Sequence, residues 1–177
     1  RGAPFLQTSS CGRLFDAVSF LVGLAPARVE YEAEAPQLLE ARATAPVKAG
    51  YAFDLDASAE PWTVSFAPLF RGLLADRKRG TPVEVMSSKF HATLAAVMVR
   101  VAERARRSRG IDMVSLAGGV FLNRRLLDLA TAGLRREGFR VLRPVLYSPN
   151  DESLSLGQTA FALAASAPVR RRRRSRA

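Results

Sequence analysis

The sequence has almost no cysteine and almost no histidine. Cys11 and His91 are the only residues of their types among 177. One cysteine forms no internal disulfide and cannot hold a zinc ion by itself, which excludes a disulfide scaffold and a cysteine-based metal module. A chain without disulfides fits a reducing compartment, and we expect a cytoplasmic protein.

Long hydrophobic runs are missing as well. The longest apolar stretches, at residues 17–27 and 161–167, are shorter than the run of about 20 residues that crosses a bilayer. The first residues contain neither an initiating methionine nor the hydrophobic segment of a signal peptide. We therefore expect a soluble protein without a membrane partner, and a piece of a longer polypeptide.

Acidic residues are outnumbered, with 16 Asp and Glu against 27 Lys and Arg and a net charge of +11. Much of the excess lies in the arginines at positions 170–174 and 176. Without them the body of the chain is only mildly basic. Residues 167–177 show no apolar periodicity, so we expect a disordered arginine-rich tail that contacts nucleic acid or anionic membrane only nonspecifically.

The rest of the composition is that of a globular domain. Hydrophobic residues make up 48% of the chain and charged residues 24%, which excludes an intrinsically disordered chain. No short repeat indicates a fibrous protein. Residues 1–166 are expected to form one domain, or one lobe of a larger one.

Hydrophobic periodicity in the first half of the chain predicts three helices and two short strands. The helices are expected over residues 11–22, 30–44 and 66–77, with Pro36 marking a break or a late start in the second. The strands are expected over residues 51–55 and 62–66, which are rich in β-forming residues.

The second half alternates between the two kinds of element. Residues 82–109 carry the clearest helical period of the chain. After them we expect a buried strand, a helix, a strand and a helix, over residues 111–116, 121–136, 139–142 and 153–165. This order predicts an α/β fold with a parallel strand pair and a right-handed crossover.

Two glycines mark the junction between the first of these strands and its helix. Gly118 and Gly119 leave the backbone N–H groups bare where a helix begins, an arrangement that binds nucleotide phosphates in open α/β folds. Asn123, one turn into the expected helix, is placed to offer its amide to a base or a sugar. An ordinary strand-to-helix turn would use the same residues, and that alternative stays open.

Two further sites carry carboxylates. Gly12 and Asp16 lie four residues apart on one helix face, where a carboxylate beside bare backbone suits the hydroxyls of a ribose. A solvated aspartate is the alternative. Asp151, in the turn before the last helix, could be a metal ligand or an N-cap. His91 and Cys11 fit packed side chains better than catalytic ones, although a general base at His91 is conceivable.

Five segments, in this order along the chain, resemble the C-terminal part of the HypF carbamoyltransferases of nickel–iron hydrogenase maturation. They are TSSCGRLFDAV at 8–18, VEYEAEA at 29–35, FHATLA at 90–95, AGGVFLNRRLL at 117–127 and PNDESLSLGQ at 149–158. The resemblance covers nearly the whole chain except the arginine tail.

The resemblance implies a fold and a reaction. The C-terminal part of HypF is similar to the tRNA threonylcarbamoyl-adenosine transferases and the O-carbamoyltransferases, in the actin and sugar-kinase superfamily of two-lobed folds. Residues 1–166 would then be the C-terminal lobe of such a fold, an incomplete sheet flanked by helices. The lobe would bind ATP or carbamoyl-adenylate, and the carbamoyl group would pass to the C-terminal cysteine of HypE for synthesis of the cyanide ligand.

The resemblance also assigns roles to residues. Gly12 and Asp16 would face the ribose, while Gly118, Gly119 and Asn123 would hold the adenosine part of the nucleotide. Asp151 would help to bind a divalent metal, either Mg, Zn or Fe. No catalytic residue is assigned.

The chain departs from the family pattern in two ways. Glu152 and Ser153 stand where the family usually has two glycines, which puts the metal site in doubt. The two histidines of the preceding lobe and the upstream domains are missing from the chain, so we expect it to be inactive alone. The alternatives are a degenerate remnant that keeps the fold without a ligand, and a basic nucleic-acid-binding module that acts through the tail.

Overall fold

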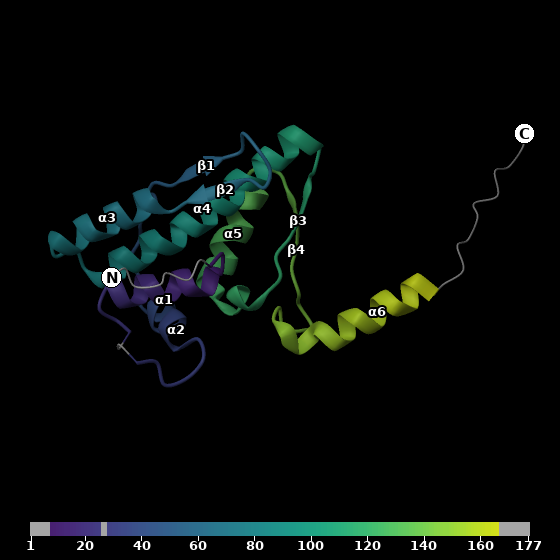
Figure 1. The fold of residues 1–177 in the computed structure, drawn as a ribbon, viewed down its shortest axis with the longest axis horizontal. Coiled ribbons are helices and arrows are strands. Elements are labelled where there is room, and N and C mark those ends of the chain that lie inside the picture. Colours follow the sequence, from purple (N-terminus) through teal and green to yellow (C-terminus); the bar gives the residue numbers. More distant parts are fainter. Residues whose placement is uncertain (1–7, 26–27, 167–177) are drawn as a thin grey trace, which may run out of the picture.

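The computed structural model describes residues 8–25 and 28–166. The predicted tail at 167–177 lies outside the described residues. Figure 1 shows the elements, which follow one another as α1 (Cys11–Leu21), α2 (Glu34–Ala41), β1 (Asp54–Asp56), β2 (Thr63–Ser65), α3 (Ala67–Lys78), α4 (Val83–Arg109), β3 (Met113–Ser115), the short 3-10 helix η1 (Gly119–Leu122), α5 (Arg124–Arg136), β4 (Arg140–Leu142), the 3-10 helix η2 (Asp151–Ser153) and α6 (Leu154–Ser166).

The first two helices begin for local reasons. The Ser10 side chain accepts a hydrogen bond from the N–H of Arg13 and so caps α1. Helix α2 is shorter at both ends than the prediction over 30–44. It begins only after Ala33, whose φ of 65° interrupts the helical backbone. Pro36 lies in the first turn of α2, where its missing N–H costs no hydrogen bond, so the predicted late start is confirmed.

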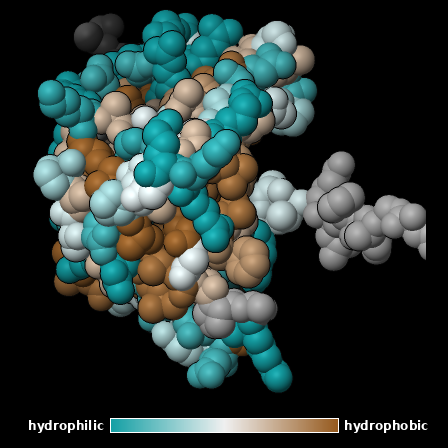
Figure 2. All heavy atoms as spheres, turned by 90° about the vertical axis from the view of Figure 1, so that its left-hand side faces the viewer, coloured by the Kyte–Doolittle hydropathy of each residue, from teal (hydrophilic) through white to brown (hydrophobic). Residues whose placement is uncertain are grey.

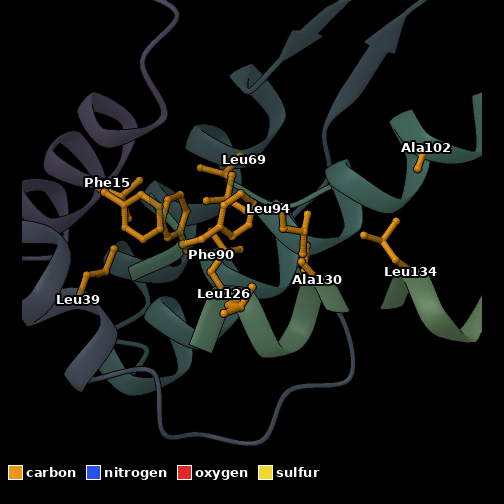
Figure 3. Packing of buried hydrophobic residues seen from close by; sticks show 14 of the residues in the cluster. Phe15, Leu39, Leu69, Phe90, Leu94, Ala102, Leu126, Ala130 and Leu134 are labelled. Carbon is orange, nitrogen blue, oxygen red and sulfur yellow. The ribbon is translucent and has the colours of Figure 1, made fainter. Parts of the chain in front are cut away.

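Helix α4 is the centre of the hydrophobic core. The rings of Phe90 on α4 and Phe15 on α1 meet edge to face with their centroids 4.9 Å apart. Leu94 continues this side of α4, and α5 packs against it with Leu126 and Leu134 (Figure 3). Of the helices within the described ranges, none combines the length and the apolar character needed to cross a bilayer.

Two small sheets complete the fold. Strands β1 and β2 pair antiparallel, and β3 and β4 pair parallel with Val114 opposite Val141. The predicted α/β arrangement with a parallel pair is therefore confirmed. The strand expected over 111–116 is confirmed at residues 113–115, but the expectation that it is buried is wrong, since Met113 is 49% exposed. Met113 and Ser115 point to the same face of β3, and the side chains of both are exposed.

Apolar side chains stay exposed on α6 and on the turn before it. Helix α6 has no buried residue and extends away from the body of the molecule (Figure 1). Its Leu154 and Phe161 are exposed, and so are Val145, Leu146 and Tyr147. On the opposite side of the molecule, Figure 2 shows hydrophobic side chains at the surface among hydrophilic ones. Exposed apolar surface of this kind marks places where other polypeptide packs.

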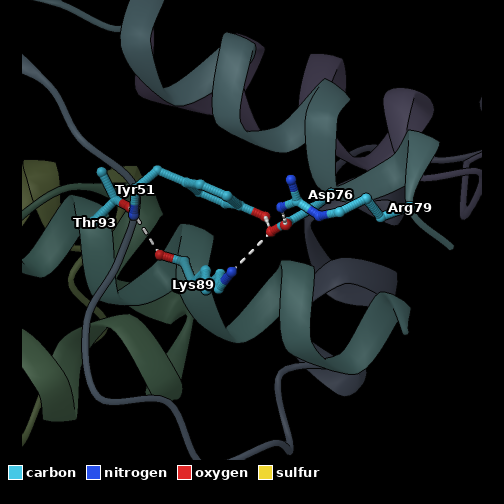
Figure 4. A network of polar contacts seen from close by, with 5 residues as sticks. All are labelled: Tyr51, Asp76, Arg79, Lys89 and Thr93. Atoms are coloured by element: carbon cyan, nitrogen blue, oxygen red, sulfur yellow. Dashed lines mark hydrogen bonds and ion pairs between the residues drawn. The ribbon is translucent and has the colours of Figure 1, made fainter. Parts of the chain in front are cut away.

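A buried carboxylate ties the segment before β1 to two helices (Figure 4). Asp76 of α3 accepts hydrogen bonds from Tyr51 Oη at 2.9 Å and from Lys89 Nζ at 2.8 Å, and it also pairs with Arg79. The backbone N–H of Tyr51 donates to Thr93 Oγ1 at 2.7 Å. These contacts fix the start of the chain segment that runs into β1.

Candidate functional site

The predicted glycine loop lies beside the turn that contains Asp151. The N–H of Gly118 donates to the carbonyl oxygen of Pro149 at 2.7 Å. Gly118 has φ 106° and ψ 157°, a conformation that residues with a Cβ rarely adopt. A Cβ built on Gly119 would lie 3.9 Å from Cβ of Asn150. The structure therefore brings Gly118 and Gly119 close to residue 151, at the carboxyl end of the parallel pair.

The helix after the glycines starts later than predicted. A 3-10 turn (Gly119–Leu122) comes first, and α5 begins only at Arg124. Asn123 is the N-cap of α5, since its Oδ1 accepts a hydrogen bond from the N–H of Leu126 at 2.8 Å. The expectation of one helix over 121–136 with Asn123 inside it is thus wrong, because the capping side chain interrupts it.

The amide of Asn123 is also held from the other side. Its Nδ2 lies 3.0 Å from Nε2 of His91, and Nδ1 of His91 lies 2.9 Å from the carbonyl oxygen of Ser87. This pattern requires that the His91 ring donate from Nδ1 and accept at Nε2. Asn123 is only 7% exposed. Both polar atoms of its amide therefore have partners inside the protein, and its contact with an adenosine stays a prediction.

His91 is a packed histidine, as the sequence favoured. It is fully buried. Burial lowers its pKa to about 4, and the nearby charge of Arg125 acts in the same direction, against the hydrogen bond to Ser87. A ring that is neutral and has both nitrogens occupied is not a general base. Cys11 is half-buried, and desolvation raises the pKa of its thiol, which fits a packing role.

Gly12 and Asp16 lie on α1, next to this arrangement through Phe15. The ring centroids of Phe15 and His91 are 5.5 Å apart. Asp16 is half-buried, and its Oδ2 pairs with Nη1 of Arg13 at 2.8 Å. Among the described residues no hydrogen bond or ion pair joins Asp16 to the glycine loop. Contacts through Phe15, His91 and Asn123 connect the two parts, and the ribose contact of Asp16 stays a prediction.

A pocket of about 150 Å³ lies between the glycine loop and the turn after β4. Most of the residues that line it are apolar types, and Arg124 is the charged residue among them. The lining residues are Leu116, Phe121, Leu122, Arg124, Leu127, Pro144, Val145, Tyr147 and Pro149. This pocket was not predicted from the sequence, although Tyr147, an aromatic residue in the turn between Pro144 and Pro149, was a signal for it.

Asp151 is exposed, and its side chain makes no capping hydrogen bond within the described residues, so the alternative that it is an N-cap is wrong. Asn150 instead caps the 3-10 helix η2 that leads into α6, because its Oδ1 accepts from the N–H of Glu152 at 3.2 Å. Within the described ranges no group of three His, Cys, Asp or Glu side chains could hold a metal ion. Asp151 on its own does not make a metal site, so its metal-binding role stays a prediction that needs ligands from elsewhere.

Comparisons with known proteins place the chain in a family. The family model described as "Carbamoyltransferase, Kae1-like Domain, second subdomain" matches residues 1–158. A carbamoyltransferase HypF of Rhizobium leguminosarum bv. viciae is 35% identical over 162 residues, which is 90% of this chain and 20% of the relative. The HypF of a Synechocystis strain is 32% identical over 152 residues, 85% of this chain and 19% of the relative.

Solved structures agree with the family match. A crystal structure of full-length HypF in a phosphate- and nucleotide-bound form superposes with a TM-score of 0.83 at 31% identity, covering 89% of this chain and 20% of that one. The chain thus spans about a fifth of the length of these relatives. It belongs to the HypF carbamoyltransferase family, in which it matches the second subdomain of the Kae1-like domain.

Proposed function

We propose that this chain is the part of a carbamoyltransferase that holds the nucleotide of a carbamoyl-adenylate. The observation that carries the proposal is the loop at Gly118 and Gly119. It follows a parallel strand, and the N–H groups of Gly119 and Val120 make no hydrogen bond within the described residues. Such free N–H groups at the start of a helical turn suit a phosphate or a ribose oxygen.

The neighbouring groups support the same placement. The pocket lined by Arg124 and Tyr147 offers apolar walls and a planar side chain to a purine ring. Asp16 accepts hydrogen bonds from the ribose hydroxyls, with Gly12 leaving room on the same helix face. Asn123 caps α5 and so fixes the conformation at the end of the glycine loop. It contributes to binding of the adenosine part from this position.

The reaction is transfer of a carbamoyl group to the thiol of a C-terminal cysteine on a HypE-like acceptor, for cyanide-ligand synthesis. The sulfur attacks the carbamoyl carbon, a C–S bond forms, and the C–O bond to AMP breaks, so that AMP leaves with the electron pair. The thiol proton goes to a base outside this chain, because its one histidine, His91, is buried and neutral.

The rest of the active site belongs to upstream domains of the same polypeptide. Residues 1–166 correspond in this proposal to the C-terminal lobe of an actin-like, two-lobed fold in a cytoplasmic enzyme. The two-stranded parallel sheet and the exposed helix α6 support an incomplete lobe. Such upstream domains would form the carbamoyl-adenylate from carbamoyl phosphate and ATP.

The first test is activity of the chain alone. Incubated with carbamoyl phosphate, ATP and the acceptor protein, it should give no carbamoylated thiol by mass spectrometry, because half of the active site is missing. Addition of the upstream domains as a separate polypeptide should yield the modified acceptor. Carbamoylation of the acceptor by the chain alone would contradict the proposal that upstream domains supply the rest of the active site.

A second test addresses the ribose contact. Asp16→Ala should raise the Kd for ATP about tenfold, which is the effect of losing a hydrogen bond to a charged group. Calorimetric titration of the full chain measures it, with Asp128→Ala as the matched control, since Asp128 is exposed on α5 and, among the residues that the structure describes, pairs only with Arg143. Equal heats for wild type and Asp16→Ala would remove Asp16 from the site. No ATP binding by the wild-type chain would refute the nucleotide-binding role itself.

A further inference from the structure

A second, larger hollow lies between β1 and α4, and the nucleotide site does not use it. Its volume is about 750 Å³. One wall consists of residues between Tyr51 and Ser58, and the other consists of Arg100, Arg104 and Arg107. The only acidic side chain in the lining is Asp54, so the hollow is basic. We call it the arginine groove.

The arginine groove runs along α4. The chain from Tyr51 onwards follows the helix in the same direction: Tyr51 N–H donates to Thr93 Oγ1 at 2.7 Å, and Arg104 Nη2 donates to the Ala57 carbonyl oxygen at 3.4 Å. Further along, Arg109 pairs with Glu60. An extended strand and a row of arginines therefore form the two long walls.

The strand wall has a free edge. Strand β1 pairs with β2 alone, and β2 contributes nothing to the lining of the groove. Phe53, Asp54 and Leu55 all line the groove although successive side chains of a strand point to opposite faces, so we infer that the groove borders the edge of β1 that β2 leaves unpaired. Between residues 52 and 57 no backbone-to-backbone hydrogen bond is formed other than those of the β1–β2 ladder. Unpaired N–H and C=O groups on such an edge can accept a further strand.

The arginines of the groove carry positive charge that other elements among the described residues do not neutralise. Within the described ranges Arg100 pairs only with Glu103 of its own helix, at 3.5 Å, and its side chain is 62% exposed. Arg107 has no ion pair with any of the described residues. The guanidinium of Arg104 lies 5.9 Å from the Trp62 ring and pairs with no carboxylate in the same part of the chain. All three are on one face of α4, because they are four and three residues apart.

The spacing of these arginines suits an extended polypeptide. Four and three residues of helix advance about 6 and about 4.5 Å, and two residues of strand advance about 6.8 Å, a difference that long arginine side chains can span. Side chains at alternate positions of a strand point to the same face. Carboxylates at every second residue of an added strand would therefore meet successive arginines of α4.

We propose that the arginine groove binds an acidic extended segment of a partner polypeptide. The segment adds to the free edge of β1 through main-chain hydrogen bonds. Its alternate Asp or Glu side chains pair with Arg100, Arg104 and Arg107. A nucleic acid could use the arginines but not the strand edge, and the experiment separates these two occupants.

The test uses the full chain and a fluorescein-labelled peptide of alternating glutamate and threonine, with fluorescence anisotropy as the readout. The double variant Arg100→Gln/Arg107→Gln should bind the peptide about tenfold more weakly than wild type. The matched control is Arg135→Gln/Arg136→Gln, which removes the same charge from the end of α5. It should bind like wild type, and the arginine tail is common to all three proteins. Equal weakening in both double variants would overturn the proposal.

Two further probes do not depend on the variants. A peptide of the same sequence with methylated backbone amides should bind at least about tenfold more weakly, because it cannot pair with β1. Equal affinity of the methylated peptide would overturn strand addition. A single-stranded oligouridine that binds more tightly than the peptide, and loses affinity in Arg100→Gln/Arg107→Gln, would overturn the assignment to a polypeptide. None of these outcomes depends on ATP binding or carbamoyl transfer.

Discussion

The free energy of unfolding should fall by about 2 kcal/mol between about pH 7 and pH 5, because His91 is buried in its neutral form. Burial lowers the His91 pKa from its ordinary value of 6.5 to about 4. The unfolded chain therefore binds a proton near pH 6.5, whereas the folded chain does so only near pH 4. This contribution to stability is fully present above pH 6.5 and is lost as the pH falls toward 4.

The variant His91→Gln tests this assignment. Glutamine can still accept a hydrogen bond from Asn123 but does not titrate, so the fall in stability over this range should disappear. Urea unfolding at several pH values, followed by the fluorescence of Trp62, measures the change; Trp62 is the one tryptophan of the chain. Carboxylates titrate mainly below about pH 5 and do not obscure the effect. The same pH dependence in His91→Gln and in wild type would assign it to another group.

The long elements could be predicted from the sequence because their hydrophobic periods are regular. Helix α4 and the parallel pair β3–β4 lie close to where the patterns place them. Exact boundaries that depend on one residue could not be predicted. Pro36 predicted a late start of α2 but not that Ala33, in a left-handed conformation, sets it, and the cap by Asn123 delays α5. Both are decided by local backbone geometry, which hydrophobic periodicity does not report.

The candidate site could be predicted only in parts. Gly118, Gly119 and Asp151 follow parallel strands, so their proximity follows from topology. The contact between His91 and Asn123 joins α4 to the start of α5, and no spacing in the sequence indicates it. The arginine groove was missed for a similar reason. Arginines at one face of a helix usually face solvent, and only the course of β1 beside α4 turns them into one wall of a groove.

Asp76→Ala should lower the free energy of unfolding by about 3 kcal/mol, the low end of the cost of removing one partner from a buried ion pair. Asp76 is 3% exposed and accepts hydrogen bonds from Tyr51 and Lys89. Without it, the hydroxyl of the half-buried Tyr51 loses its acceptor. The low end applies because the side chains of Lys89 and Arg79 are 31% and 67% exposed and can regain water.

The pH dependence of the difference in unfolding free energy between wild type and Asp76→Ala tests whether the Asp76 carboxylate causes that difference. Desolvation raises the pKa of Asp76, but hydrogen bonds from Lys89, Tyr51 and Arg79 outweigh it and hold the pKa below its ordinary value of 3.8. The stabilisation is therefore complete above pH 3.8 and is lost as the pH falls through the lowered pKa. The difference in unfolding free energy between wild type and Asp76→Ala should disappear in acid.

The control Asp112→Ala removes a carboxylate that is 77% exposed and pairs with Arg106, so its unfolding midpoint should stay near that of wild type. If Asp76→Ala were still less stable than wild type in strong acid, lost packing and not the lost carboxylate charge would explain its lower stability.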